Sequence, residues 1–305
     1  MLLKAIHDYL AVRRAAGFDL KPQETLLLSF ERFASAQGET HIRAQTAIEW
    51  ASISRSSRQQ GCRLAAVIVF ARHAKAEDSR HEIPPMHVFP YKFKKRFSAF
   101  IFSASDIQRM MNAASQLKHQ GSFLPKMYRV LFGLLAATGM RISEALALRF
   151  DDVTPDGLVI RKTKFRKTRL LPLHKTTAAA LDRYLGKRPQ VGGIEDHLFL
   201  SLRERPLYYD AVLKTFRGIV RGLGLPTVPE RPAPRIHDLR HTFAVRALES
   251  CPVGRRDLIS RHILALATYL GHSCVSHTHW YLQLTPYLTR DIADACEAFL
   301  KEIQP

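Results

Sequence analysis

Cysteine is scarce in this sequence and never occurs in a close pair. The 305 residues contain four cysteines, and no two of them form a Cys-x-x-Cys motif. A chain long enough for two domains, each with its own core, does not need disulfides to stabilise it. The scattered thiols therefore favour a reducing, cytosolic setting and exclude the disulfide-rich secreted scaffolds.

Long apolar runs are also missing. The least polar stretch, residues 130–140, is too short to span a bilayer. Charged residues at Lys4, Asp8 and Arg13 interrupt the N-terminal apolar run that a signal peptide requires. We therefore expect an intracellular protein with no membrane partner.

Acidic residues are few relative to basic ones. The chain has 27 Asp and Glu against 46 Lys and Arg, which gives a formal net charge of +19. A small acidic metabolite does not need such a charge, whereas a polyanion does. Because 46% of the residues are hydrophobic, the charge must lie on a folded body and not on a disordered tail. The composition favours a globular nucleic-acid-binding protein.

The first eighty residues carry helical signals. Apolar residues recur at steps of three and four, and Pro22, Gly17 and Gly38 stand where helices would start or end. The predicted helices are residues 3–16, 26–36, 44–53 and 64–76. We therefore expect a four-helix domain over residues 1–82.

A proline-rich segment without helical period follows, and we expect residues 83–102 to be a linker between domains. Within it, aromatic residues are interleaved with four cations, Lys92, Lys94, Lys95 and Arg96. This pattern can follow a phosphate backbone while the rings pack on protein or sugar. A solvated basic linker over a hydrophobic seam would give the same pattern.

The rest of the chain, residues 103–305, predicts a second domain. Two strand-like runs, residues 158–160 and 170–173, flank residues 161–169, of which six are Lys or Arg. We expect a hairpin with a cationic tip, placed among helices. The predicted helices begin at a Ser105-Asp106 N-cap and also include residues 126–137, 143–149, 176–184, 209–222, 237–249, 263–270, 275–284 and 288–303. The predicted fold class is α+β, mainly α, with a small antiparallel sheet.

Three blocks concentrate polar groups inside this helical pattern. In residues 137–144, Gly139 permits a tight turn before Arg141. In residues 235–243, His237 and Arg240 stand three residues apart and therefore on one helix face. In the third block, His272 follows a helix-ending glycine and precedes Tyr281 by nine residues.

These blocks and the hairpin resemble the tyrosine recombinase (phage integrase) family. The run Arg169-Leu170-Leu171-Pro172-Leu173 resembles the end of the family's cationic hairpin, which carries a catalytic lysine eight residues before the proline. The helical N-terminal domain is similar to the family's SAM-like core-binding domain. A longer gap between the second and third blocks, caused by an insertion at residues 251–261, departs from the family pattern. The catalytic residues that the resemblance implies are Arg141, Lys164, His237, Arg240, His272 and Tyr281.

The chemistry explains why these residue types occur together. A tyrosine hydroxyl has a pKa near 10 and is a weak nucleophile toward a negatively charged phosphodiester. Arg141 and Arg240 can offset the charge that grows in the transition state, and His237 can accept the tyrosine proton. His272 can hydrogen-bond the phosphate, and Lys164 can protonate the leaving 5′ oxygen. Tyr281 would then hold the DNA 3′ end, and the reaction requires no metal and no other cofactor.

The resemblance also implies partners. We expect double-stranded DNA with paired core sites, contacted by the four linker cations and by three hairpin cations, Lys162, Arg166 and Lys167. Strand exchange through a Holliday junction requires four protomers, and an apolar stripe in residues 288–303 could dock in a neighbouring copy or pack on its own domain. The expected setting is the bacterial cytoplasm, associated with the nucleoid. The expected role is integration or transposition of a mobile element, with or without sister recombinases.

Two other interpretations remain open at this stage. His237, Asp238 and His241 form an HDxxH pattern that resembles zinc hydrolase sites, although the neighbouring Arg240 would repel a metal ion. A DNA-binding accessory protein of the same fold, without chemistry, would carry the same basic charge. Metal analysis and trapping of a covalent DNA adduct distinguish these interpretations.

Overall fold

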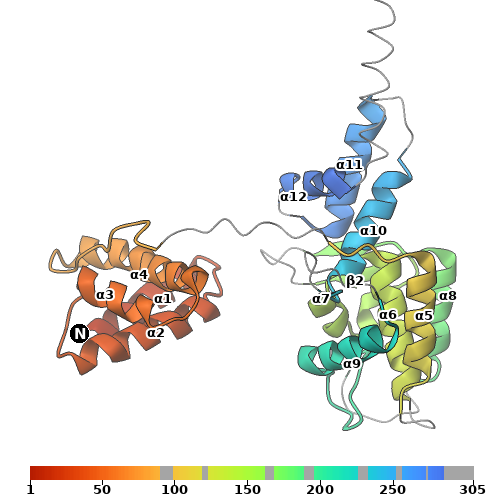
Figure 1. The fold of residues 1–305 in the computed structure, drawn as a ribbon, viewed down its shortest axis with the longest axis horizontal. Helices are drawn as coiled ribbons and strands as arrows, with labels where there is room; N and C mark the ends of the chain where they lie inside the picture. Colours follow the sequence, from red (N-terminus) through yellow and green to blue (C-terminus); the bar gives the residue numbers. More distant parts are fainter. Residues whose placement is uncertain are drawn as a thin grey trace, which may run out of the picture. The chain divides into compact units, whose positions relative to one another are not determined.

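The computed structural model describes residues 1–89, 99–118, 123–161, 168–188, 196–225, 233–251, 256–272 and 274–284. The chain divides into two compact units, Met1–Arg96 and Phe97–Pro305 (Figure 1). None of the helices in these described parts combines the length and the apolar character that crossing a membrane requires.

The first unit consists of four helices around one core. They are α1 (Leu2–Ala15), α2 (Lys21–Ala36), α3 (Ala44–Ser52) and α4 (Ser57–Glu77). The rings of Phe30 and Trp50 meet edge to face at 5.5 Å in this core, and Phe70 is fully buried beside them. Helix α4 starts seven residues before the predicted 64–76 segment, because its polar first turns carry no apolar period.

The second unit opens with Phe100 and Phe102, which are buried in its core although the sequence analysis placed them in the linker. Helix α5 (Ala104–Ser115) begins at Ser103 and not at the expected Ser105-Asp106 pair. Ser103 accepts a hydrogen bond from the Asp106 backbone, and the Asp106 carboxylate accepts one from the Ser103 backbone. Helix α6 (Leu124–Thr138) packs along α5 and is followed by the short α7 (Ile142–Leu146).

The sheet is small and antiparallel, as predicted. After a 3₁₀ turn, η1 (Phe150–Asp152), come β1 (Val153–Thr154), β2 (Gly157–Ile160) and β3 (Arg169–Leu171), in the order β1-β2-β3. Ile160 pairs with Arg169, so β2 and β3 are the two arms of the predicted hairpin. Gly157 has φ +135°, and a Cβ there would lie 2.3 Å from the Leu171 carbonyl oxygen, so only glycine fits.

The other helices in the described residues make this unit mainly α-helical. They are α8 (Lys175–Leu185), α9 (Tyr209–Gly222), α10 (Asp238–Glu249), α11 (Arg256–Leu270), α12 (Ser276–His279) and the 3₁₀ helix η4 (Trp280–Leu284). Helix α10 contacts α6, α11 and η4. Helix α11 starts at Arg256, so the second half of the expected insertion forms its first turns. The predicted helix 288–303 lies outside the described residues.

Candidate active site

Arg141 stands at the turn between α6 and α7. Gly139 ends α6 with φ +60°, and a Cβ on it would lie 2.5 Å from the ring of Phe243 in α10. The turn is therefore packed directly on α10 and requires glycine. Arg141 follows as the N-cap residue of α7, with 30% of its side chain exposed. The predicted tight turn thus presents Arg141 to solvent next to α10.

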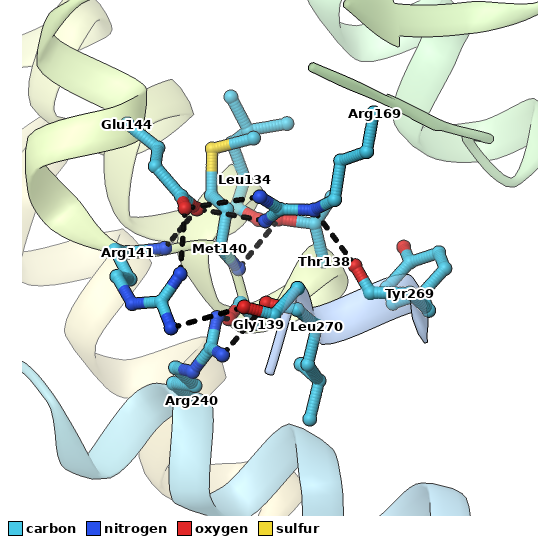
Figure 2. Close-up of polar contacts among 11 residues, drawn as sticks. Leu134, Thr138, Gly139, Met140, Arg141, Glu144, Arg169, Arg240, Tyr269 and Leu270 are labelled. Atoms are coloured by element: carbon cyan, nitrogen blue, oxygen red, sulfur yellow. Dashed lines mark hydrogen bonds and ion pairs between the residues drawn. The ribbon is translucent and has the colours of Figure 1, made fainter. Parts of the chain in front are cut away.

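Arg240 lies in the interior of the same region. Only 3% of Arg240 is exposed. Its Nη1 donates a hydrogen bond of 2.8 Å to the Gly139 carbonyl oxygen, and its Nη2 donates one of 2.8 Å to that of Leu270 (Figure 2). Burial, followed by the positive charge of Arg141, lowers the pKa of Arg240 to about 10. The group still carries its charge at neutral pH, and two helix ends fix its orientation.

Glu144 connects Arg141 to a third arginine. Its carboxylate accepts 2.8 and 2.9 Å bonds from the Arg141 guanidinium and backbone, and Arg169 donates to both of its oxygens at 3.0 and 2.8 Å (Figure 2). Burial by itself raises the pKa of Glu144, but the hydrogen bonds from Arg169 and Arg141 outweigh burial and leave the pKa below its ordinary value. The sequence analysis did not identify Glu144, although its position three residues after an N-cap is a known signal.

His272 and Tyr281 come from the segment after α11. His272 Nδ1 lies 2.7 Å from the Thr278 hydroxyl, and its ring stacks on that of Tyr281 at 6.3 Å. Tyr281 is only 3% exposed. Burial raises the pKa of the Tyr281 hydroxyl, and the nearby positive charge of Arg240 opposes this effect. The hydroxyl is therefore protonated at neutral pH and needs a base before it can act as a nucleophile.

Two further imidazoles from α10 complete the cluster. His241 Nδ1 lies 3.1 Å from the Tyr281 hydroxyl, and the rings of His237 and His241 meet edge to face at 4.7 Å. The sequence analysis considered His241 only as a metal ligand. Its spacing of four from His237, which places both on one helix face, is the signal that could have suggested a place in this site.

The three imidazoles share a low basicity. Burial first, then neighbouring positive groups, lowers the pKa of His237 to about 4, of His241 to about 3 and of His272 to about 4. His237 is nevertheless an exposed residue, whereas His241 and His272 are half-buried. All three are neutral at pH 7 and are able to accept a proton.

The structure thus brings together Arg141, His237, Arg240, His272 and Tyr281. Lys164 and the other hairpin cations, Lys162, Arg166 and Lys167, lie outside the described residues. The linker cations Lys92, Lys94, Lys95 and Arg96 lie outside them as well. The cluster that is described combines fixed positive charge, neutral imidazoles and a tyrosine hydroxyl, which suits chemistry on an anionic ester.

The acidic residue of the HDxxH pattern is engaged in other contacts. The buried Asp238 carboxylate accepts bonds of 2.8 and 2.9 Å from the Arg235 backbone and guanidinium. Among the described residues, the His, Cys, Asp and Glu side chains that group like metal ligands are His41, Asp78 and His81 of the first unit. There, His81 Nδ1 accepts the Ile42 backbone N–H at 3.0 Å, so that nitrogen is not available to a metal.

Comparison with known proteins agrees with this chemistry. Residues 101–287 match the phage integrase family. The chain belongs to that family and is a tyrosine recombinase, an enzyme of DNA recombination and integration.

Similar proteins include relatives by sequence and by fold. The chain is 37% identical over 300 residues, 94% of each chain, to the integrase/recombinase y4rB of Sinorhizobium fredii. It is 27% identical over 259 residues to the tyrosine recombinase XerD of Halalkalibacterium halodurans, covering 83% of this chain and 77% of XerD. The Tn1549 transposon integrase, solved in complex with transposon right-end DNA, shares the fold with a TM-score of 0.62 and 15% identity, over 92% of this chain and 94% of that one.

Proposed function

We propose that this enzyme cleaves and rejoins DNA at specific sites through a covalent 3′-phosphotyrosine on Tyr281. The observation that carries the proposal is the convergence of Arg141, Arg240 and the Tyr281 hydroxyl. Arg240 and Arg141 both donate to carbonyl oxygens of the Leu270–Gly271 turn, at 2.8 and 3.4 Å. The charge of Arg240 also acts to lower the pKa of the Tyr281 hydroxyl, which favours loss of its proton.

The two guanidiniums would bind the non-bridging oxygens of the scissile phosphate. A guanidinium can donate two parallel hydrogen bonds to a phosphate, and its charge offsets the negative charge that develops during attack. Arg240 is held by two carbonyl oxygens before DNA arrives, so the orientation of its guanidinium is already fixed.

The proton of Tyr281 would pass to a neutral imidazole, which we assign to His237. As the Tyr281 oxygen bonds to phosphorus, the bond from phosphorus to the 5′ oxygen breaks, and Lys164 protonates that oxygen. His272 would hydrogen-bond the phosphate. An anion next to an imidazole raises its pKa. Bound DNA would therefore raise the pKa values of these imidazoles toward 7, where acid-base catalysis is efficient. Attack by another 5′ hydroxyl reverses the step and joins new strands through a Holliday junction.

The proposed biological role is integration or transposition of a mobile element. The S. fredii relative, named as an integrase/recombinase, and the fold shared with a transposon integrase bound to transposon-end DNA support this role. In this proposal residues 1–82 bind the core site, residues 83–102 form a basic linker and residues 103–305 carry the chemistry. The partner is double-stranded DNA with paired core sites, bound by four protomers that dock through residues 288–303.

A nicked DNA substrate that loses its 5′ fragment after cleavage tests the proposal, because it traps the adduct. Wild-type protein should form a DNA complex that resists SDS, and Tyr281→Phe should bind DNA and form none. Trp280→Phe, which changes the neighbouring ring and leaves the hydroxyl in place, is the matched control and should still form the adduct. An adduct with Tyr281→Phe would overturn the assignment and direct attention to Tyr287, and a wild type that binds DNA without any adduct would support the accessory-protein alternative.

A further inference from the structure

The side chain of Arg169 joins two segments of the active site at the start of β3. Its Nη1 and Nη2 donate to the two oxygens of Glu144 at 3.0 and 2.8 Å, and its Nε donates to the Tyr269 carbonyl oxygen at 3.0 Å (Figure 2). Only 12% of the side chain is exposed. The guanidinium is therefore fixed at three points inside the protein and is not a surface cation.

Glu144 receives two arginines at once. Each of its oxygens accepts one bond from Arg169 and one from Arg141, and the carboxylate side chain is only 7% exposed. One negative charge thus faces two positive ones. Because Arg169 compensates the carboxylate, the charge of Arg141 is left in excess and is available to an anion in front of it.

Arg169 also packs on the turn before His272. Gly271 has φ +67°, and a Cβ there would lie 2.8 Å from Arg169 Nη1. On the same turn, the Gly271 carbonyl oxygen accepts a bond from Arg141 Nη2 at 3.4 Å. The guanidinium of Arg169 therefore lies against the backbone that orients both Arg141 and His272.

We propose that Arg169 is a positioning residue for DNA cleavage: it compensates Glu144 and supports the Gly271 turn, so that Arg141 points its charge at the scissile phosphate. This inference rests on the proposed function and adds to it a residue that does not touch the DNA. Without Arg169, the buried carboxylate of Glu144 would attract the remaining N–H groups of Arg141. A lysine keeps the charge but cannot make the fork and the third bond together.

The test measures single-turnover cleavage at saturating protein, so that DNA binding does not enter the rate. Arg169→Met should cleave an ordinary phosphodiester about 10²-fold more slowly, the scale expected when a catalytic group shifts by about 1 Å. Arg169→Lys should recover only part of the rate. Arg161→Met is the matched control, because Arg161 lies at the other arm of the hairpin base and pairs with a different carboxylate, Asp152. It should stay within a few fold of wild type.

Two further measurements separate positioning from a general loss of structure. A methylphosphonate at the scissile position lacks the negative charge that Arg141 offsets, so the deficit of Arg169→Met relative to wild type should shrink on it, as should that of Arg141→Ala. Adding Glu144→Gln to Arg169→Met should raise the rate of phosphodiester cleavage above that of Arg169→Met, because the uncompensated carboxylate is removed. Circular dichroism checks that each variant folds. If Arg169→Met does not fold, the same cleavage measurements are made on Arg169→Lys.

Equal slowing of Arg169→Met on both substrates would overturn the proposal, as would a double variant slower than Arg169→Met. Wild-type cleavage by Arg169→Met, with Tyr281→Phe inactive, would overturn this inference alone. An adduct with Tyr281→Phe would instead overturn the proposed function.

Discussion

His241 of α10 and Tyr281 of η4 share a hydrogen bond of 3.1 Å between Nδ1 and the phenolic oxygen. The two residues are forty positions apart in the sequence; Tyr281 belongs to the buried cluster between α10 and α11, and its ring lies 5.5 Å from that of His241. A hydroxyl that is held in this way inside the protein must be uncovered before a phosphodiester can reach it. In the proposed mechanism, this contact therefore belongs to the enzyme before it engages DNA.

The neutral imidazoles predict a loss of stability in acid. In the unfolded chain a histidine binds a proton near pH 6.5, whereas burial lowers the pKa of His237, His241 and His272 to between about 3 and about 4 in the folded chain. The unfolded state thus binds more protons below pH 6.5, so the free energy of unfolding should fall as the pH drops from 6.5 toward 4.

Urea unfolding at pH 7, 6 and 5, followed by circular dichroism, measures this dependence. His241→Gln should show a smaller fall than wild type, because one of the three groups no longer titrates. His7→Gln, on the exposed side of α1, is the control and should match wild type. An unfolding midpoint that does not change with pH would contradict the neutral state of the cluster.

The general acid can be tested by changing the leaving group. Lys164→Ala should cleave ordinary DNA roughly 10²- to 10⁴-fold more slowly, the usual loss for one general acid. A substrate with sulfur at the bridging 5′ position should restore its rate, because a thiolate leaves without a proton. Arg141→Ala lacks a positive charge at the phosphate but keeps the proton donor. Sulfur should therefore restore much less of its cleavage rate.

The hairpin offers its own control for this experiment. Lys162→Ala removes a cation two residues away that is expected to contact DNA, so at saturating protein it should cleave ordinary DNA at nearly the wild-type rate. If sulfur rescues Lys162→Ala and not Lys164→Ala, or rescues Lys164→Ala and Arg141→Ala equally, the assignment of Lys164 is wrong.

The linker cations should contribute affinity without sequence preference. A variant with Lys92, Lys94, Lys95 and Arg96 changed to alanine should bind DNA less tightly. Its log-log salt slope should become shallower by about 0.9 for each phosphate that the protein no longer neutralises. Titration of cognate and random DNA at several salt concentrations measures both effects, and the ratio between the two affinities should change little. An unchanged slope would show that the linker does not contact DNA.

The C-terminal segment should serve assembly. Removing the residues after Tyr287 deletes the apolar stripe of Leu288, Ile292, Ala295 and Phe299. The truncated protein should still bind a single site but should not bring two sites together, because a head-to-tail ring needs this contact. Gel-shift and synapsis assays distinguish the two steps. Full recombination by the truncated protein would show that the segment packs on its own domain.

Sequence patterns predicted the elements whose signals are local. Helix α9 has the predicted bounds, Tyr209–Gly222, because apolar residues follow its period from end to end. The first turns of α4 and α11 were missed because they are polar and are stabilised by the rest of each helix.

Pairing between distant segments was not predictable in the same way. The bonds between Glu144 and Arg169 join residues twenty-five positions apart, and neither residue carries a local signal for the other. The same holds for His241 and Tyr281. The motif spacing predicted which segments carry the polar groups, whereas these contacts depend on how α7, β3, α10 and η4 meet in the folded chain.

The hydrogen bonds of Arg240 have one more consequence. Gly139 is the C-cap of α6 and Leu270 is the last residue of α11, so this single guanidinium caps the C-terminal ends of two helices. Both helices direct the negative end of their dipole at it. A substitution by a side chain without N–H donors therefore leaves both carbonyl oxygens without this donor, and it also removes the charge that the proposed mechanism requires. An inactive variant that keeps this support for the two helix ends is therefore expected from Tyr281→Phe, at the proposed nucleophile, and not from a change at Arg240.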